Sequence, residues 1–185
     1  MTYPYSQEEK MELLENCIYI LSDIYLSNGR EISVSRQELS HMFFLSDRLS
    51  NIFSLTFRQS SHGFLSEELN NFLDREKFVF DLRYPIEGEN DQFWFVLSKS
   101  FRKIMKRPKI TQHINALSTI IEGFCSPFGL KLLAATLHFS KSISNSKEIE
   151  KLEYLINNNF PQQNKFTKHH IEKALLNLEP ILSCS

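Results

Sequence analysis

Two short runs of aromatic and β-branched residues, with helical patterns on both sides, constrain the fold of this chain more than any other feature. The runs cover residues 78–84 and 92–97, and a polar loop that contains Gly88 joins them. This arrangement is typical of a β-hairpin. The loop covers residues 85–91, which is longer than a two-residue hairpin turn, so no tight turn is expected.

The sequence before the hairpin carries several signals for helix starts. Ser6 with Glu9, and Ser35 with Glu38, have the spacing of a capping box. Ser66 is a third N-cap candidate, and apolar residues at helical spacing follow each of these positions. The predicted elements are a helix that reaches Asn28-Gly29, a short strand at 32–34, a helix from Ser35 that Ser46-Asp47 interrupts, a helical or extended stretch at 49–57, a loop at 58–63 and a helix at 67–75.

Every element predicted after the hairpin is helical. Ser126 followed by Pro127 is an N-cap residue with proline in the first helical position, where the missing amide hydrogen has no partner to lose. Pro108, Pro161 and Pro180 are expected to end helices. The predicted helices begin at Ser98 or Ser100, Thr111, Ser126, Ser146 and Thr167.

This order of elements predicts a mainly α-helical protein with a small β-hairpin. A helical unit closed by a hairpin is the coarse signature of a winged helix, although other α+β domains share the order. We expect a winged-helix-like module in residues 1–107, with the hairpin as its wing, and a helical C-terminal half in residues 108–185. The hydrophobic content of 42%, with 16 Phe, is sufficient for one packed core, and the two parts are expected to pack as one unit.

Charge is distributed unevenly along the chain although the total is near zero. The net charge of −1 argues against a globally basic nucleic-acid coat, yet no Asp or Glu occurs between Asp91 and Glu122. Helical spacing puts most cations of this stretch on one face, as phosphate binding requires. We predict a nucleic-acid- or partner-binding stripe formed by Lys99, Arg102, Lys103, Lys106, Arg107 and Lys109. The alternative is a solvated helix face with acidic partners elsewhere in the fold.

The opposite bias at the N-terminus has a structural explanation. Glu8, Glu9, Glu12 and Glu15 lie in the first turns of the first predicted helix, where carboxylates interact favourably with the helix dipole. The alternative interpretation is an acidic docking surface for a basic partner or for a second copy of the chain.

Histidine, cysteine and glycine positions predict no metal, cofactor or nucleotide site. The three cysteines are far apart and form no CxxC motif, no histidine has a spacing such as HExxH, and the five glycines form no phosphate-binding loop. The Ser60–His62 loop is the exception, because loops often carry function. A hydrolase that uses Ser60 and His62 is the least favoured alternative, since neighbours in sequence do not supply the geometry of a catalytic triad.

The first residues of the chain are polar and acidic, unlike a secretory signal. The longest apolar runs have about four residues, far fewer than the ~20 that span a membrane. We therefore expect a cytoplasmic protein with no membrane segment, whose cysteines are reduced thiols.

Two stretches of the chain resemble a bacterial winged-helix group. One is Gly63–Leu73, GFLSEELNNFL, and the other is Leu130–Phe139, LKLLAATLHF, followed by Phe166-Thr167 and a helix to Leu178. They are similar to the patterns GPYSxEL and LELLATVHxL…KFTxxxIxxAxxxL of that group, which includes YwgA-like proteins and the C-terminal domain of DarG-type antitoxins. The likeness covers residues 10–178, and this chain has Phe64-Leu65 where the pattern has Pro-Tyr.

The resemblance implies a helical protein with a wing that acts through protein or nucleic-acid contacts in a bacterial or phage toxin–antitoxin or defence setting. It implies no catalytic residues. We therefore expect a non-enzymatic interaction protein whose partner is a toxin or defence-complex subunit, a nucleic acid, or both. A DNA-binding transcriptional regulator is the alternative, and homo-oligomerisation is left open.

Overall fold

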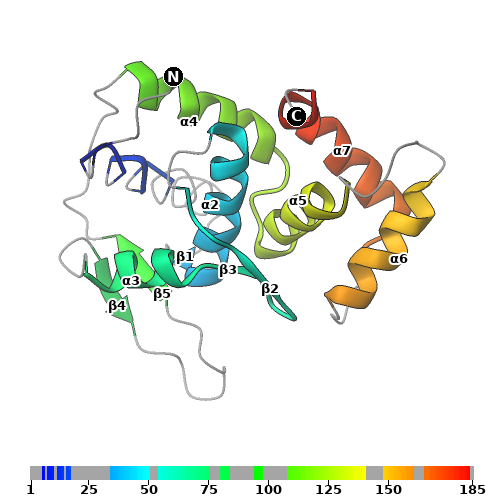
Figure 1. Cartoon of the computed structure of the whole chain (residues 1–185), viewed down its shortest axis with the longest axis horizontal. Coiled ribbons are helices and arrows are strands. Elements are labelled where there is room, and N and C mark those ends of the chain that lie inside the picture. The colour runs from blue at the N-terminus through cyan, green and yellow to red at the C-terminus, as the bar shows by residue number, and fades with distance from the viewer. Residues whose placement is uncertain are drawn as a thin grey trace.

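Helices form most of the part of the chain that the structure describes, and short strands lie at one side of them (Figure 1). The computed structural model describes residues 6, 8–10, 12–14, 16–17, 34–50, 54–75, 80–83, 94–97, 108–140, 148–160 and 165–183. Residues 8–10, 12–14 and 16–17 are helical. The helices that follow are α2 (Arg36–Ser50), α3 (Glu67–Arg75), α4 (Pro108–Ile121), α5 (Pro127–Ser140), α6 (Ile149–Asn159) and α7 (Lys168–Leu182). The strands are β1 (Val34–Ser35), β2 (Arg58–Ser60), β3 (Gly63–Leu65), β4 (Phe80–Arg83) and β5 (Trp94–Leu97).

The hairpin predicted from the aromatic runs is confirmed. β4 and β5 pair antiparallel, with Phe80 opposite Leu97 and Arg83 opposite Trp94. β1 pairs antiparallel with the other edge of β5, which gives the sheet order β1-β5-β4. In a winged helix, a strand precedes two helices and pairs with the second strand of the hairpin that follows them. β1, α2, α3 and the β4–β5 hairpin have this order and pairing, so the expected fold class is correct.

Local capping explains where several of the described helices begin. Ser35 and Glu38 form the predicted capping box: the Glu38 N–H donates to Ser35 Oγ at 3.1 Å, and the Ser35 N–H donates to Glu38 Oε2 at 2.8 Å. Ser6 and Glu9 form the same reciprocal pair at 3.2 and 2.7 Å. Ser66 accepts from the Leu69 N–H at 3.3 Å at the start of α3.

The predicted interruption of α2 at Ser46-Asp47 is wrong, because the helix continues to Ser50. Ser46 is fully buried, and its hydroxyl is hydrogen-bonded at 2.7 Å to His113 of α4. This tertiary contact removes the competition with the backbone that makes serine a weak helix former.

The prediction that prolines end helices is also wrong at two positions. Pro108 does not end a helix but begins α4, since proline is well accommodated in the first helical position. Pro180 lies inside α7, which continues to Leu182. The Ser183 N–H still donates to the Glu179 carbonyl at 2.9 Å, so the last turn closes beyond the proline.

The polar segment predicted as a loop is a second hairpin. β2 and β3 pair antiparallel, with Arg58 opposite Leu65, and Ser61-His62 form the turn between them. Gly63 has a φ of +136°, which favours glycine. Strands of three residues, one of them wholly polar, show no alternation of apolar and polar side chains, so the pattern carried no strand signal.

Phe64 of this second hairpin joins elements from both parts of the chain. Its ring stacks on Phe44 of α2 with 4.3 Å between centroids, and it contacts His138 of α5 and Phe160 at 4.9 and 5.5 Å. The Ser40 hydroxyl of α2 donates to the Phe64 carbonyl at 2.6 Å. Such aromatic contacts add to the free energy of burial, so the hairpin stabilises the packing of α2 against the C-terminal helices.

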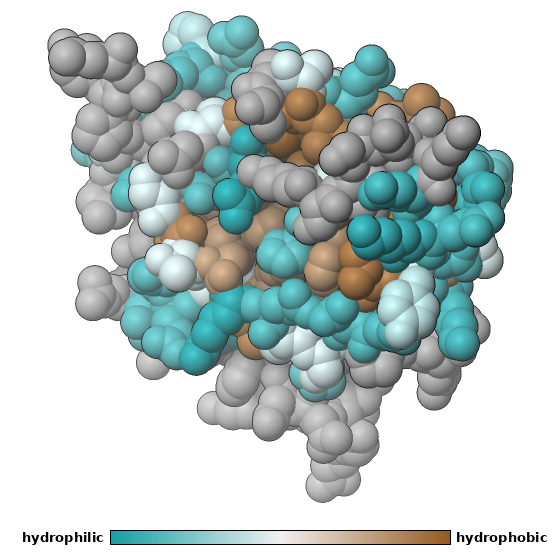
Figure 2. All heavy atoms as spheres, turned by 45° about the vertical axis from the view of Figure 1, so that its right-hand side comes forward, coloured by the Kyte–Doolittle hydropathy of each residue, from teal (hydrophilic) through white to brown (hydrophobic). Residues whose placement is uncertain are grey.

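A single core cluster contains buried residues from α2, β3, α3, α4, α5, α6 and α7. The space-filling view, which brings the right-hand side of Figure 1 forward, shows apolar atoms in a band between hydrophilic ones (Figure 2). Within the ranges that the structure describes, no helix is both long and apolar enough to cross a membrane.

Candidate interaction surface

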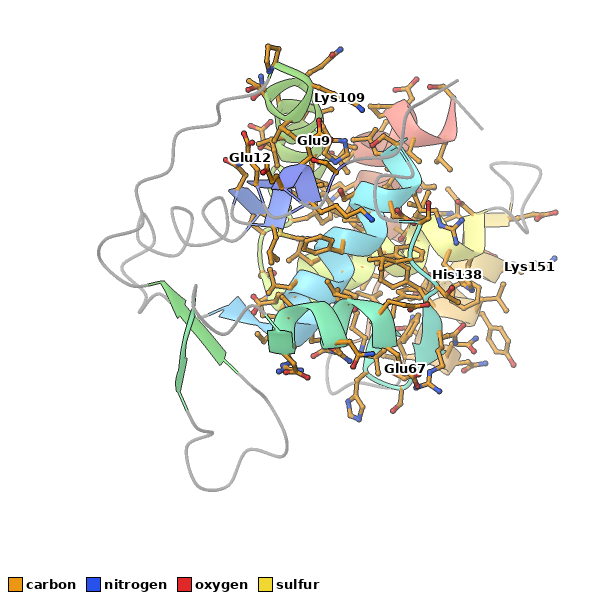
Figure 3. The ribbon with its side chains drawn as sticks, turned by 60° about the vertical axis from the view of Figure 1, so that its left-hand side comes forward. Glu9, Glu12, Glu67, Lys109, His138 and Lys151 are labelled. Carbon is orange, nitrogen blue, oxygen red and sulfur yellow. The ribbon has the colours of Figure 1, made fainter. Side chains whose placement is uncertain are left out.

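α3 occupies the position that precedes the wing in the winged-helix order. Leu69 and Leu73 bury its inner side, at 1% and 2% exposure. The outward residues Glu67, Glu68 and Asp74 are exposed, and Figure 3 shows Glu67 on this side of the molecule. The helix therefore presents carboxylates where a winged helix would approach a partner.

Two ion pairs connect this acidic face to neighbouring elements. Arg58 of β2 lies 2.5 Å from Glu67, and both side chains are about 70% exposed, at 70% and 71%. Arg36 of α2 pairs with Asp74 at the other end of α3. The Arg58–Glu67 pair is exposed, and such pairs contribute about 1 kcal/mol or less to stability, whereas the Arg36 side chain is only 20% exposed.

Glu68 adds a negative charge that no arginine neutralises in these pairs. Ser66 donates its hydroxyl to Glu68 Oε2 at 2.9 Å. The hydrogen bond from the Glu68 backbone amide, and then that from Ser66, hold the pKa of the Glu68 carboxyl below its ordinary value. With three carboxylates and two guanidinium groups, the described face of α3 carries one net negative charge, which is unfavourable for phosphate contact.

α2 also carries buried polar groups. Glu38 is 1% exposed, and its Oε2 accepts hydrogen bonds from the amide and hydroxyl of Ser35, whereas its Oε1 is buried without a hydrogen-bond partner. Burial raises the pKa of the Glu38 carboxyl to about 7, although the Ser35 hydrogen bond acts in the opposite direction. His41 follows one turn later and is also buried, and burial lowers its pKa to about 3, with the Lys131 charge as a smaller cause.

His113 forms a polar bridge between α2 and α4 that was not predicted from the sequence. Its Nε2 lies 2.7 Å from Ser46 Oγ and its Nδ1 lies 2.9 Å from Ser50 Oγ, which connects α4 to two consecutive turns of α2. Burial lowers the pKa of His113 to about 4. Ser46 is 0% exposed, so no substrate reaches this hydroxyl, and the Ser–His contact serves packing. The only signal in the sequence was a serine pair at helical spacing, which is too common to be informative.

The predicted basic stripe falls almost entirely outside the described residues. This applies to Lys99, Arg102, Lys103, Lys106 and Arg107. Lys109 is described and exposed near the start of α4, at the end of the molecule where Glu9 and Glu12 also lie (Figure 3). A phosphate-binding role for the stripe therefore stays a prediction.

The Ser60–His62 loop is the turn region of the second hairpin. The Ser60 hydroxyl donates to the Gly63 carbonyl at 3.1 Å and accepts from the His62 N–H at 3.2 Å. The carbonyl of His62 accepts from Gln37 of α2. Within the described ranges, no side chain forms a hydrogen bond with the His62 imidazole, so these residues form no nucleophile–base pair here.

The described ranges also contain no group of three or more His, Cys, Asp or Glu side chains that could hold a metal ion. Cys17 is buried, and burial raises the pKa of its thiol to about 12. Cys125 donates its S–H to the Ile121 carbonyl at 3.1 Å at the end of α4, as expected for a thiol at a helix end.

Comparison with known proteins adds no relative from which a function could be transferred. No family model matches this chain, and no curated protein sequence shows significant similarity to it.

Proposed function

We propose that this chain is a non-enzymatic interaction protein that binds a basic surface of a partner protein through α3 of its winged-helix module. The observation that carries the proposal is the outward face of α3, where Glu67, Glu68 and Asp74 are exposed. A helix in this position would enter a groove of DNA in a DNA-binding winged helix, and carboxylates there would repel phosphates. The same charges attract a cationic protein surface and accelerate its association.

The rigidity of α3 supports this function. Ser66 caps the helix, Leu69 and Leu73 anchor it in the core, and the two arginine pairs hold both of its ends. A preorganised face loses less conformational entropy on binding. The resemblance to antitoxin domains makes a toxin or a defence-complex subunit the class of partner that we propose.

Site-specific photo-crosslinking tests the contact surface. We would place p-benzoylphenylalanine at the exposed Asn71 of α3 and, as a matched control, at the exposed Lys151 of α6. The proposal expects one protein to be crosslinked at position 71 and not at position 151 in the native host. A crosslink to DNA at position 71 would contradict it.

Charge reversal then measures the contribution of the acidic face. Glu67→Lys with Glu68→Lys is expected to weaken binding of the purified partner about tenfold. Glu150→Lys with Glu153→Lys on α6 makes the same change in net charge and is expected to leave the affinity unchanged. Equal affinities for the two double variants would remove α3 from the interface.

A DNA-binding regulator is the second candidate. The observation in its favour is the absence of acidic residues between Asp91 and Glu122, a stretch that contains six cations within Lys99–Lys109. In this case the phosphate contacts would come from the stripe that follows the wing and not from α3.

A further inference from the structure

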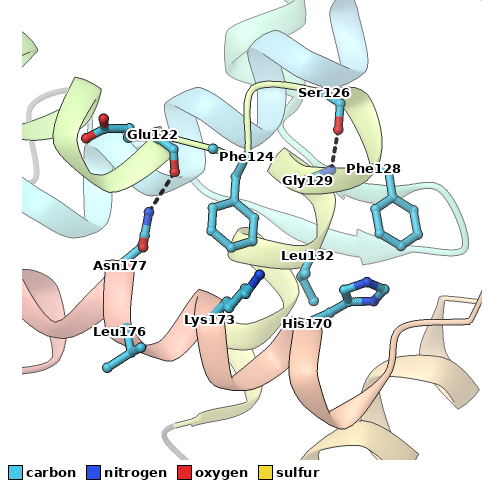
Figure 4. Close-up of a pocket in the computed structure, with 11 residues that line it drawn as sticks. Glu122, Phe124, Ser126, Phe128, Gly129, Leu132, His170, Lys173, Leu176 and Asn177 are labelled. Carbon is cyan, nitrogen blue, oxygen red and sulfur yellow. Dashed lines mark hydrogen bonds between the residues drawn. The ribbon is translucent and has the colours of Figure 1, made fainter.

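A pocket of about 480 Å³ lies between the turn that joins α4 to α5 and the outer side of α7 (Figure 4). This volume falls in the range of cavities that hold one small molecule. Its position at α7 is at the other end of the molecule from α3 (Figure 1). The lining residues are Glu122, Gly123, Phe124, Ser126, Phe128, Gly129, Leu132, His170, Lys173, Leu176 and Asn177.

The walls of the pocket are held by specific contacts. The Asn177 side-chain amide of α7 donates to the carbonyls of Ile120 and Glu122 at 3.0 and 2.9 Å, which satisfies acceptors at the end of α4. Gly129 lies so close to the preceding turn that a Cβ there would be 2.5 Å from the Phe124 carbonyl oxygen. The Ser126 hydroxyl accepts from the Gly129 N–H at 3.0 Å. The pocket is therefore formed before any ligand arrives.

One part of the lining is apolar and aromatic. Phe124 and Phe128 are half-buried, Leu132 is buried, and Leu176 is 72% exposed at the rim. Phe128 meets the His170 ring edge to face, with 5.8 Å between centroids. Leu176 and Tyr154 are the two large hydrophobic residues that are exposed among the described residues, so a ligand that covers Leu176 gains hydrophobic free energy.

The other part of the lining consists of hydrogen-bond donors on α7. The Thr167 N–H donates to His170 Nδ1 at 3.3 Å, so the neutral imidazole carries its proton on Nε2 and can donate from that atom. Lys173 follows at i+3 on the same side of the helix, and Figure 4 shows its side chain extending from α7 toward Phe124. Lys173 forms no ion pair with any residue in the described parts of the chain.

We propose that this pocket binds a small amphipathic carboxylate, with one aromatic or short acyl group and a single negative charge. The carboxylate pairs with the Lys173 ammonium and accepts from His170 Nε2, and the apolar group lies against Phe124, Phe128 and Leu176. The Glu122 carboxylate is exposed at the opposite rim, which disfavours a second negative charge on the ligand. A multiply charged ligand such as a nucleotide therefore fits the site poorly.

A matched pair of probes tests this assignment. Phenylacetate and phenylacetamide share one ring and differ in charge, and both can be titrated into ¹⁵N-labelled protein while amide resonances are followed by NMR. Phenylacetate is expected to shift the resonances of Gly123, Gly129 and Lys173 and to bind about fivefold more tightly than the amide, the effect of one partly exposed ion pair. Equal affinities, shifts confined to other elements, or no saturable shift would overturn the proposal.

Two variants separate the charged contact from the apolar one. Lys173→Gln is expected to lower the affinity for phenylacetate to that for the amide, whereas Lys151→Gln on α6 removes one charge elsewhere and leaves both affinities unchanged. Leu176→Ser is expected to weaken both probes, and the exposure of this side chain means that folding is retained. If Lys151→Gln lowers the affinity as much as Lys173→Gln does, the probe responds to the net charge of the protein and not to a site at Lys173.

The natural carboxylate is either a free acid or the C-terminus of a peptide chain. N-acetyl-Gly-Phe presents the same ring and carboxylate at a chain end. If this probe binds more tightly than phenylacetate, the natural carboxylate is the C-terminus of a protein chain. If it binds more weakly, the natural carboxylate is a free acid. Failure of all three probes would overturn the inference without affecting the proposal for α3, which a different surface carries.

Discussion

His41 of α2 lies directly beneath Gly63 of the second hairpin, so closely that a Cβ on Gly63 would be 2.0 Å from His41 Nε2. Both ring nitrogens of His41 are buried and have no hydrogen-bond partner. The hairpin thus covers a neutral imidazole and allows no side chain between the two elements. Because Phe64 follows immediately and contacts both α2 and α5, this close approach also determines how the hairpin joins the two parts of the protein.

Gly63→Ala is expected to destabilise the fold by about 2–4 kcal/mol, because the new methyl group overlaps the buried imidazole and the residue must hold a φ of +136°. Chemical denaturation measures the loss. Gly123→Ala is the control, since its φ is +77° but nothing lies within 4 Å of a Cβ there, and it is expected to cost only about 1 kcal/mol. Equal losses would show that backbone strain, and not the contact with His41, accounts for the effect.

Ser46→Ala is expected to cost about 1–3 kcal/mol, because it leaves the Nε2 atom of the buried His113 ring without its partner at 2.7 Å. Ser50→Ala removes the other partner at 2.9 Å, but Ser50 is exposed, so water can replace its hydroxyl and the cost is smaller. Thermal unfolding of both variants checks the order. A larger loss for Ser50→Ala would contradict the burial-dependent role of this bridge.

Glu38→Gln is expected to change how stability depends on pH. The folded-state pKa of Glu38 is raised to about 7, so its protonated form stabilises the fold at low pH and this contribution is lost as pH rises from about 4.5 through 7. Between pH 4.5 and 8 the free energy of unfolding of the wild type should therefore fall by about 3 kcal/mol relative to that of the variant. Glu150→Gln on α6 controls for the loss of one carboxylate. A pH-independent difference for Glu38→Gln would refute the buried state of this carboxyl.

His41 and His113 act in the opposite direction to Glu38. Their folded-state pKa values are lowered to about 3 and about 4, so the stability that they contribute is present above pH 6.5 and is lost as pH falls toward those values. Because the two histidines together change stability more than the one carboxyl does, the free energy of unfolding of the wild type is expected to fall by about 1 kcal/mol per pH unit between pH 6 and 5. Glu38→Gln should make this acid loss about twice as steep.

Lys103→Glu with Arg107→Glu tests the DNA-binding alternative. If the stripe contacts phosphates, the double variant should bind every duplex more weakly and reduce the salt dependence of binding, by about two counterions in the slope. Fluorescence anisotropy with labelled DNA from low to physiological salt measures both quantities. Unchanged affinity and slope would remove these residues from any phosphate contact.

The elements that could be predicted depend on contacts over a few residues. The wing hairpin, the Ser35–Glu38 box, the Ser66 cap and the Thr167 cap were all expected. The caps join residues three positions apart, and the wing pairs two strands that follow one another in the chain. Partners three residues apart meet in any helix start, whatever the rest of the chain does. Such features can therefore be recognised before the fold is known.

The uninterrupted α2 and the α7 pocket could not be predicted, because each depends on residues far apart in the chain. The second hairpin could not be predicted because its three-residue strands show no alternation of apolar and polar side chains. Ser46 meets His113 across 67 positions, and Asn177 meets Ile120 across 57. The sequence by itself thus determined that most of these helices exist, several of their caps, the wing and the class of the fold. Only the tertiary structure decided which polar groups are buried, which carboxylates face outward on α3 and which donors line the pocket, because those properties arise when distant segments exclude water from one another.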